Sequence, residues 1–234
     1  MPNIEKPFLP GAVIFDMDGL MLDTERPVMD LWLRAAQNLG WEIHRETMLC
    51  TIGVDGRATR GILLEKYGKD FPYTEIHEEL IRLNHETVEK EGIACKPGLL
   101  TLLDRLTALG VPFGVATSTA RAGALWKLEQ AHIRDRFDLI TCGDEVIHGK
   151  PAPDIFLLAA KRLGQPPAAC VGFEDSTAGL RALAAANIRS VFIKDLLEPP
   201  EEVLATVWRR CGDLAEAAQL FGRTDEPLPK WLNS

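Results

Sequence analysis

Short runs of apolar residues recur along the chain, and each ends in polar residues or glycine. The first covers residues 12–16, and similar runs cover 112–116, 169–173 and 190–193, with a weaker one at 137–140. Such runs are typical of parallel strands buried on both faces. Stretches of helical character lie between and after them, at residues 99–109, 120–131, 154–163 and 177–186. This alternation predicts an α/β fold with a doubly wound, Rossmann-like parallel sheet.

The interval from residue 24 to residue 95 interrupts the alternation. It shows helical periodicity at 28–39, 59–67 and 74–90 and contains no strand-like run. The apolar residues Ile76, Leu80 and Leu83 recur at helical spacing and are expected to form part of a helical core. We therefore predict an inserted all-helical cap domain at residues 23–95 and a core domain made of residues 1–22 and 96–234.

Composition and charge exclude several classes of protein. The 234 residues are 46% apolar and 26% charged, which is ordinary for a globular chain. The net charge of −8 comes without a basic run, so no nucleic-acid partner is expected. No apolar stretch is long enough to span a membrane and the first residues lack a signal-peptide layout, so we expect a cytoplasmic protein. The five cysteines are widely spaced and predict neither a zinc site nor a disulfide framework.

Two carboxylates follow the first predicted strand. Asp16 and Asp18 are two residues apart, a spacing at which strand side chains point the same way. At about 4 Å and an effective dielectric of about 20, their repulsion would be roughly 4 kcal/mol. A fold with no use for this pair should avoid it, although calcium binding or simple solvation would also explain the pair on its own.

Further polar groups follow the later strands, near the sheet edge at which such folds bind ligands. They are Thr117, Lys150 and the pair Glu174 and Asp175. Each has a structural alternative. Residues 117–119 are expected to cap the next helix while also presenting donors to an anion, Asp154 after Lys150 is a good N-cap, and residues 174–176 could cap another helix.

Taken in order, these stretches resemble the four motifs of the haloacid dehalogenase superfamily, in particular its β-phosphoglucomutase-like branch of sugar-phosphate phosphatases and mutases. The motifs correspond to residues 16–25, 115–118, 150–154 and 171–179. The resemblance covers nearly the whole chain. It implies a Rossmann-like core whose small helical cap closes over a phosphorylated substrate.

The resemblance also implies roles for individual residues. Asp16 would take the phosphoryl group, and Asp18 would protonate the leaving oxygen and then deprotonate water. We hypothesise that crowding of the two carboxyl groups raises one pKa and keeps Asp18 available as an acid. Thr117 and the Ser118 amide would hold phosphate oxygens, and Lys150 would offset their charge.

A metal ion is implied in the same way. Its ligands would be the Asp16 carboxylate, the Asp18 carbonyl and Asp175, with Glu174 beside them. These carboxylates outnumber the lysine and a bound phosphate would add negative charge, so a divalent cation is needed. All-oxygen ligands favour Mg²⁺ over zinc or copper.

Substrate recognition is expected on the inner face of the cap. The candidates are Thr24, Glu25 and the stretch 53–57, in which Arg57 could bind an anionic or hydroxylated group or could simply be a solvated residue at a helix start.

Departures from the mutase pattern favour a phosphatase of a small metabolite, such as a sugar phosphate, over a hexose-phosphate mutase. Mutases of this branch have alanine where this chain has Glu25, and histidine where it has Val28; Arg57 also stands one place later than expected. Asp18 argues against dehalogenase chemistry. A receiver-like signalling module would be about half as long, and a catalytically dead binding relative would lack a motif residue. The oligomeric state stays open, with a monomer favoured.

Overall fold

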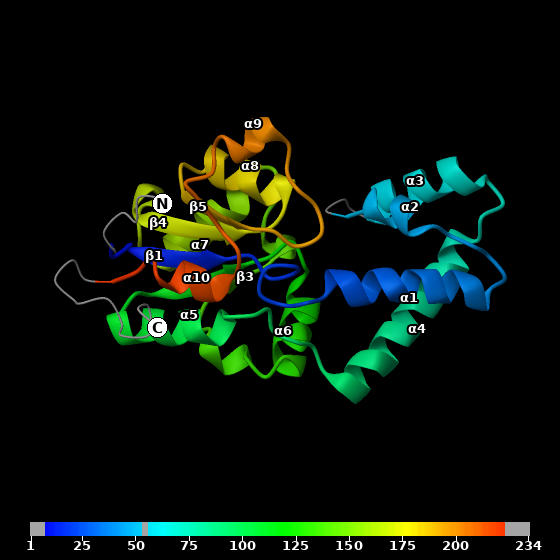
Figure 1. Ribbon diagram of the computed structural model, residues 1–234, viewed down its shortest axis with the longest axis horizontal. Coiled ribbons are helices and arrows are strands. Elements are labelled where there is room, and N and C mark those ends of the chain that lie inside the picture. The colour runs from blue at the N-terminus through cyan, green and yellow to red at the C-terminus, as the bar shows by residue number, and fades with distance from the viewer. Residues whose placement is uncertain (1–7, 53–55, 223–234) are drawn as a thin grey trace.

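A parallel sheet forms the centre of the computed structural model, which describes residues 8–52 and 56–222 (Figure 1). Its order is β3-β2-β1-β4-β5-β6. The strands are β1 Ala12–Phe15, β2 Phe113–Ala116, β3 Ile140–Thr141, β4 Cys170–Glu174, β5 Arg189–Ile193 and β6 Arg209–Cys211. The order changes direction between β1 and β4, which pair in register as Val13 with Val171. The predicted doubly wound fold is confirmed, and its switch point lies beside the first motif.

Helices cover both faces of the sheet. One layer contains α5 Leu99–Leu109, α6 Arg121–Gln130 and α10 Leu214–Ala218, and the other contains α7 Asp154–Arg162 and α8 Thr177–Ala185. The short helix α9 Glu201–Leu204 packs on α8. Single turns of 3₁₀ helix occur at Arg134–Arg136, Gly143–Glu145 and Pro167–Ala169.

Strand β1 explains why its run is apolar throughout. Val13 and Phe15 join the core under α5 and α6, whereas Ala12 and Ile14 join the core under α7 and α8. Because strand side chains alternate between faces, a strand covered on both sides needs apolar residues at every position. The polar residues that follow Phe15 therefore begin where the buried strand ends.

Some elements differ from the sequence prediction. The weak run at residues 137–140 becomes a strand only at Ile140–Thr141, and Phe137 is instead a buried core residue before it. Strand β6 was not predicted, because it lies at the sheet edge, is only partly buried and begins with Arg209 and Arg210. The prediction that Asp154 is an N-cap is wrong, since Pro153 holds that position and Asp154 is the first helical residue.

The interval that interrupts the alternation is helical, as predicted. It forms α1 Glu25–Asn38, α2 Arg45–Leu49, α3 Gly56–Tyr67 and α4 Tyr73–Glu91, of which α2 was not predicted. These helices share an apolar core separate from that of the sheet, and they stand to one side of it (Figure 1). Ile76, Leu80 and Leu83 are buried in that core.

Two chain segments join these helices to the sheet, and they run side by side. The amide of Asp23 donates to the Ala94 carbonyl at 2.9 Å, and Leu22 pairs with Cys95. Asp195, buried after β5, accepts from Lys96 at 2.7 Å and from Arg26 at 2.6 Å. Asp195 thus binds one cation from the first turn of α1 and one from the segment that returns to the sheet.

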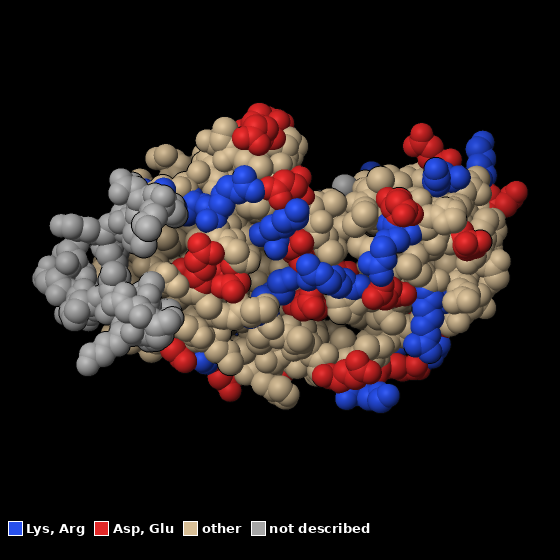
Figure 2. Space-filling view, viewed as in Figure 1, with Lys and Arg blue, Asp and Glu red and all other residues tan. Residues whose placement is uncertain are grey.

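The surface carries charges of both signs. On the face shown in Figure 2, Lys and Arg side chains lie among Asp and Glu side chains rather than in one basic patch. Within the described ranges, no helix combines the length and apolar character needed to cross a lipid bilayer.

Candidate active site

The Asp16 carboxylate lies at the switch point of the sheet. Asp16 directly follows β1, and its amide donates to the Phe173 carbonyl of β4 at 3.0 Å. Its Oδ1 accepts a short hydrogen bond from Lys150 Nζ, which also donates to Glu174 Oε1 at 2.6 Å. All three side chains are at most one-tenth exposed, so the ion pairs are shielded from solvent.

Burial dominates the protonation of this group. It raises the pKa of Asp16 to about 8, with a smaller contribution of the same sign from Glu174, while Lys150 acts in the opposite direction. Burial alone would lower the pKa of Lys150, but the two carboxylates raise it above its ordinary value, so the lysine stays charged. The predicted repulsion by Asp18 is the smallest of the effects on the pKa of Asp16.

Glu174 is held in place by the start of helix α8. Its Oε2 accepts hydrogen bonds from the amides of Asp175 and Ser176, at 3.0 and 2.9 Å, and from the Ser176 hydroxyl. The predicted capping role applies to Ser176, whose hydroxyl accepts from the Gly179 amide. A Cβ at Gly179 would lie 1.7 Å from Glu174 Oε1, so only glycine fits there.

Three carboxylates form a cluster that fits a divalent cation. One oxygen from each of Asp16, Glu174 and Asp175 lies within 4.8 Å of the others. Asp175 Oδ1 is buried without a hydrogen-bond partner, and burial together with Glu174 and Asp16 raises the pKa of Asp175 well above its ordinary value. A Cβ at Gly19, where φ is +83°, would lie 2.4 Å from Asp175 Oδ2. An oxygen-only donor set containing an unpartnered oxygen suits a hard metal ion.

Asp18 faces a different set of groups from Asp16. Its Oδ1 accepts from the Thr24 hydroxyl at 2.9 Å and from Lys127 Nζ at 2.6 Å, and its Oδ2 accepts from the Thr119 hydroxyl at 2.7 Å. Burial alone would raise the pKa of Asp18, but Lys127 and the two hydroxyls lower it below its ordinary value. The hypothesis that crowding keeps Asp18 protonated is therefore wrong for this arrangement.

Lys127 was not identified in the sequence. It lies in α6 beyond the second motif, and nothing in its local pattern distinguishes it from a solvated helical lysine. It adds a second cation to the charge balance, which counted only Lys150.

The second motif supplies Thr117 and Ser118 at the end of β2. Thr117 is buried, and its Oγ1 accepts from the Thr119 amide at 3.1 Å, which leaves its hydroxyl hydrogen able to donate. Ser118 is exposed. The prediction that these residues cap helix α6 is wrong, because Ala120 holds the N-cap position and makes no side-chain hydrogen bond there.

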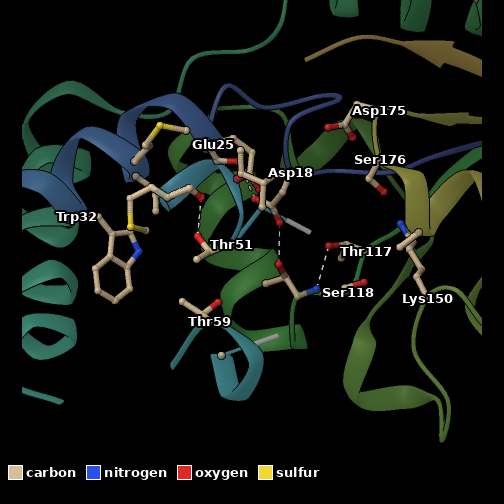
Figure 3. Close-up of a pocket in the computed structure, with 18 of the residues that line it drawn as sticks. Asp18, Glu25, Trp32, Thr51, Thr59, Thr117, Ser118, Lys150, Asp175 and Ser176 are labelled. Carbon is tan, nitrogen blue, oxygen red and sulfur yellow. Dashed lines mark hydrogen bonds between the residues drawn. The ribbon is translucent and has the colours of Figure 1, made fainter. Parts of the chain in front are cut away.

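A cleft of about 790 Å³ connects these groups with the helical insert (Figure 3). Eight of the predicted site residues line it, namely Asp16, Asp18, Thr24, Glu25, Thr117, Ser118, Lys150 and Asp175. Glu174 lies behind the cleft wall, fully buried. Figure 3 shows Lys150, Asp175 and Ser176 at one end of the cleft and Trp32 at the other.

The cap candidates differ in position. Thr24 and Glu25 lie where α1 leaves the core, and burial raises the pKa of Glu25, with Asp18 contributing in the same direction. Arg57 is exposed in the first turn of α3 and is not among the residues that line the cleft. Gly53, Val54 and Asp55 of the same stretch lie outside the described residues.

Comparisons with known proteins identify the family of this chain. The family model for haloacid dehalogenase-like hydrolases matches residues 10–187. Protein CbbY of Rhodobacter capsulatus is 34% identical over 88% of this chain and 95% of its own, and a phosphorylated carbohydrates phosphatase of Thermotoga maritima is 33% identical over 77% and 83%. The crystal structure of a β-phosphoglucomutase from Clostridium difficile superposes with a TM-score of 0.67 at 25% identity, covering 88% of this chain and 92% of that one.

Proposed function

The chain belongs to the haloacid dehalogenase-like hydrolases, in the β-phosphoglucomutase-like branch, and from this premise we propose that it hydrolyses a small phosphorylated metabolite through a phosphoryl group carried on Asp16. The observation that carries the proposal is the buried Asp16 carboxylate, which lies at the sheet's switch point beside Lys150 and opens into the same cleft as Asp18. The phosphorylated carbohydrates phosphatase among its relatives supports a sugar phosphate as substrate.

In the first half of the reaction, an Asp16 oxygen attacks phosphorus and the bond between phosphorus and the substrate's alcohol oxygen breaks. Asp18 gives its proton to that oxygen. In the second half, water attacks the phosphoryl group, Asp18 takes a proton from the water, and Asp16 is regenerated as phosphate leaves. Asp18 is held as an anion by Lys127, Thr24 and Thr119, so the acid step requires it to exchange these partners for the substrate oxygen.

Lys150, Thr117 and Ser118 would hold the transferring phosphoryl group. Lys150 is charged and fixed by two carboxylates, so it places positive charge beside Asp16 without reorganisation. The Thr117 hydroxyl and the Ser118 amide supply neutral donors at the end of β2. Most of the catalysis is then positioning and charge stabilisation, as expected for phosphoryl transfer.

The metal would be Mg²⁺, held by Asp16, Asp175 and the backbone carbonyl of Asp18. Glu174 would support the site from behind, because both of its oxygens already accept hydrogen bonds. When bound, the ion neutralises charge on the phosphoryl oxygens and on the acidic cluster.

Two cleft residues favour transfer to water over transfer to a sugar. Val28, which stands where the mutase pattern has histidine, lines the cleft next to Glu25, where that pattern has alanine. We assign residues 23–95 to a cap that excludes bulk water and binds the part of the substrate beyond the phosphate. Residues 1–22 and 96–234 are assigned to the catalytic core. No partner beyond the substrate is required.

Release of inorganic phosphate from a panel of sugar phosphates, with Mg²⁺ or with chelator, tests the proposal. We expect Mg²⁺-dependent turnover that Asp16→Asn abolishes, whereas the control Asp30→Asn, at an exposed carboxylate of α1, retains it. Incubation with β-glucose 1-phosphate and catalytic glucose 1,6-bisphosphate separates the two reactions. Rapid formation of glucose 6-phosphate without phosphate release would instead establish a mutase.

A further inference from the structure

The end of the cleft farthest from Asp16 has an apolar and aromatic wall. Helix α1 contributes Val28, Met29 and Trp32, and the segments around α2 and α4 contribute Met48, Ile52, Tyr73, His77 and Leu80. Thr51 and Thr59 add two hydroxyl groups to the same end of the cleft, but apolar and aromatic side chains outnumber them. This composition suits a part of the substrate that is flat or largely apolar.

Three rings pack against one another in that wall. The Trp32 ring lies 5.8 Å from the Tyr73 ring and 5.8 Å from the His77 ring, measured between centroids. Tyr73 and His77 stack at 5.7 Å with an interplanar angle of 12°. We call Trp32, Tyr73 and His77 the aromatic wall. Trp32 is 7% exposed, Tyr73 and His77 are partly exposed, and all three line the cleft.

Charge is unevenly distributed along the cleft. Both lysines that line it, Lys127 and Lys150, come from the core end, and among the described residues that line it no Lys or Arg comes from the helical insert. A second phosphate at the cap end would therefore lack a cation in the described lining, because Arg60, which acts on the pKa of Tyr73, is exposed and does not line the cleft. The group that binds against the aromatic wall should be uncharged.

The distance from the core end suits an intervening sugar. Glu25, Val28, Met29 and Trp32 lie on one face of α1, and Trp32, seven positions after Glu25, is about 10 Å farther along the helix. A phosphate at Asp16 and a ring at Trp32 would leave room between them for a hydroxylated unit beside Thr24 and Glu25. The cleft volume of about 790 Å³ is sufficient for such a molecule.

We propose that the aromatic wall is a subsite for an uncharged planar ring, so that the preferred substrate is a phosphate monoester of a ring-bearing sugar, of the nucleoside monophosphate kind. The proposal rests on the phosphatase activity proposed above and specifies its alcohol. Trp32, Tyr73 and His77 are then specificity-determining residues, and the ring stacks on or packs against them.

A matched pair of substrates tests the subsite. Ribose 5-phosphate and a nucleoside 5′-monophosphate share the same phosphorylated sugar and differ in the base. We expect the nucleotide to have a kcat/KM about tenfold higher or more, because its base can stack on aromatic side chains. Equal values, or a preference for ribose 5-phosphate, would overturn the subsite while leaving the phosphatase intact. Failure of every phosphate monoester in a broad panel to release phosphate would show instead that the phosphatase proposal had failed, and the subsite with it.

Variants at Tyr73 test whether the aromatic wall causes the preference for the nucleotide over ribose 5-phosphate. Tyr73→Leu removes the ring and should lower the ratio of the two kcat/KM values by about threefold or more, whereas Tyr73→Phe keeps the ring and should retain the ratio. Because both substrates are measured on the same preparation, the ratio does not depend on the fraction of folded enzyme. Ile81→Ala, at an exposed position of α4 outside the cleft, is the control. A ratio unchanged in both Tyr73→Leu and His77→Ala would overturn the assignment.

Discussion

Replacing Lys150 by methionine removes the cation that pairs with both Asp16 and Glu174. The lysine side chain is 6% exposed, and the two carboxylates are 10% and 0% exposed, so solvent cannot replace the lost charge. Breaking a buried ion pair costs about 3–5 kcal/mol. Asp16 can take up a proton, since its pKa is already raised to about 8, so the low end of that range, about 3 kcal/mol, is expected.

The loss should appear in both stability and catalysis. For a chain of this size, about 3 kcal/mol corresponds to a fall in Tm of roughly 6–12 °C. Loss of a fixed charge at the phosphoryl group should lower kcat by about 10²–10³-fold. Thermal unfolding in chelator and phosphate release at saturating substrate measure the two effects. The control Lys161→Met replaces an exposed lysine of α7. A Lys150→Met variant with kcat within tenfold of the parent would refute the assigned role.

Three further predictions follow from the same geometry. The pKa of Asp16 is raised from 3.8 to about 8, so in chelator its contribution to stability is fully present below about pH 4 and is lost as the pH rises through 8; Tm should therefore fall between pH 5.5 and pH 8, and Asp16→Asn should flatten the slope. Gly179→Ala places a methyl group against the Glu174 carboxylate, so we expect a loss of about 1–3 kcal/mol in urea unfolding together with reduced kcat; a variant as stable as the parent would contradict the packing. Arg57→Ala should leave kcat/KM within about twofold for every substrate, since Arg57 is exposed outside the cleft lining, and a tenfold loss on one substrate would show that it reaches the alcohol.

Much of the fold could be predicted because buried parallel strands need apolar residues on both faces. Helix α5 was predicted at its observed bounds, and in the structure glycines in the left-handed conformation, Gly98 and Gly110, stand at its two ends. The edge strand β6 was not predicted. A partly buried edge strand does not require an apolar run, and β6 begins with the charged residues Arg209 and Arg210.

The site was harder to predict where it depended on long-range contacts. The spacing of Asp16 and Asp18 suggested that their side chains point the same way, but β1 ends at Phe15 and the chain then turns, so strand alternation no longer applies. Each carboxylate consequently has its own lysine. The contact between Lys127 and Asp18 joins residues that are 109 positions apart in the chain, so no local sequence pattern predicts it.

The central claim, that Asp16 carries the phosphoryl group, is tested most directly by rapid acid quenching during turnover, borohydride reduction and peptide mass spectrometry. Borohydride converts an aspartyl phosphate to homoserine, so the account predicts homoserine at position 16 and at no other carboxylate, with the signal absent when substrate is omitted. Turnover without modification at position 16, or with modification at Asp18 or Asp175 instead, would contradict it.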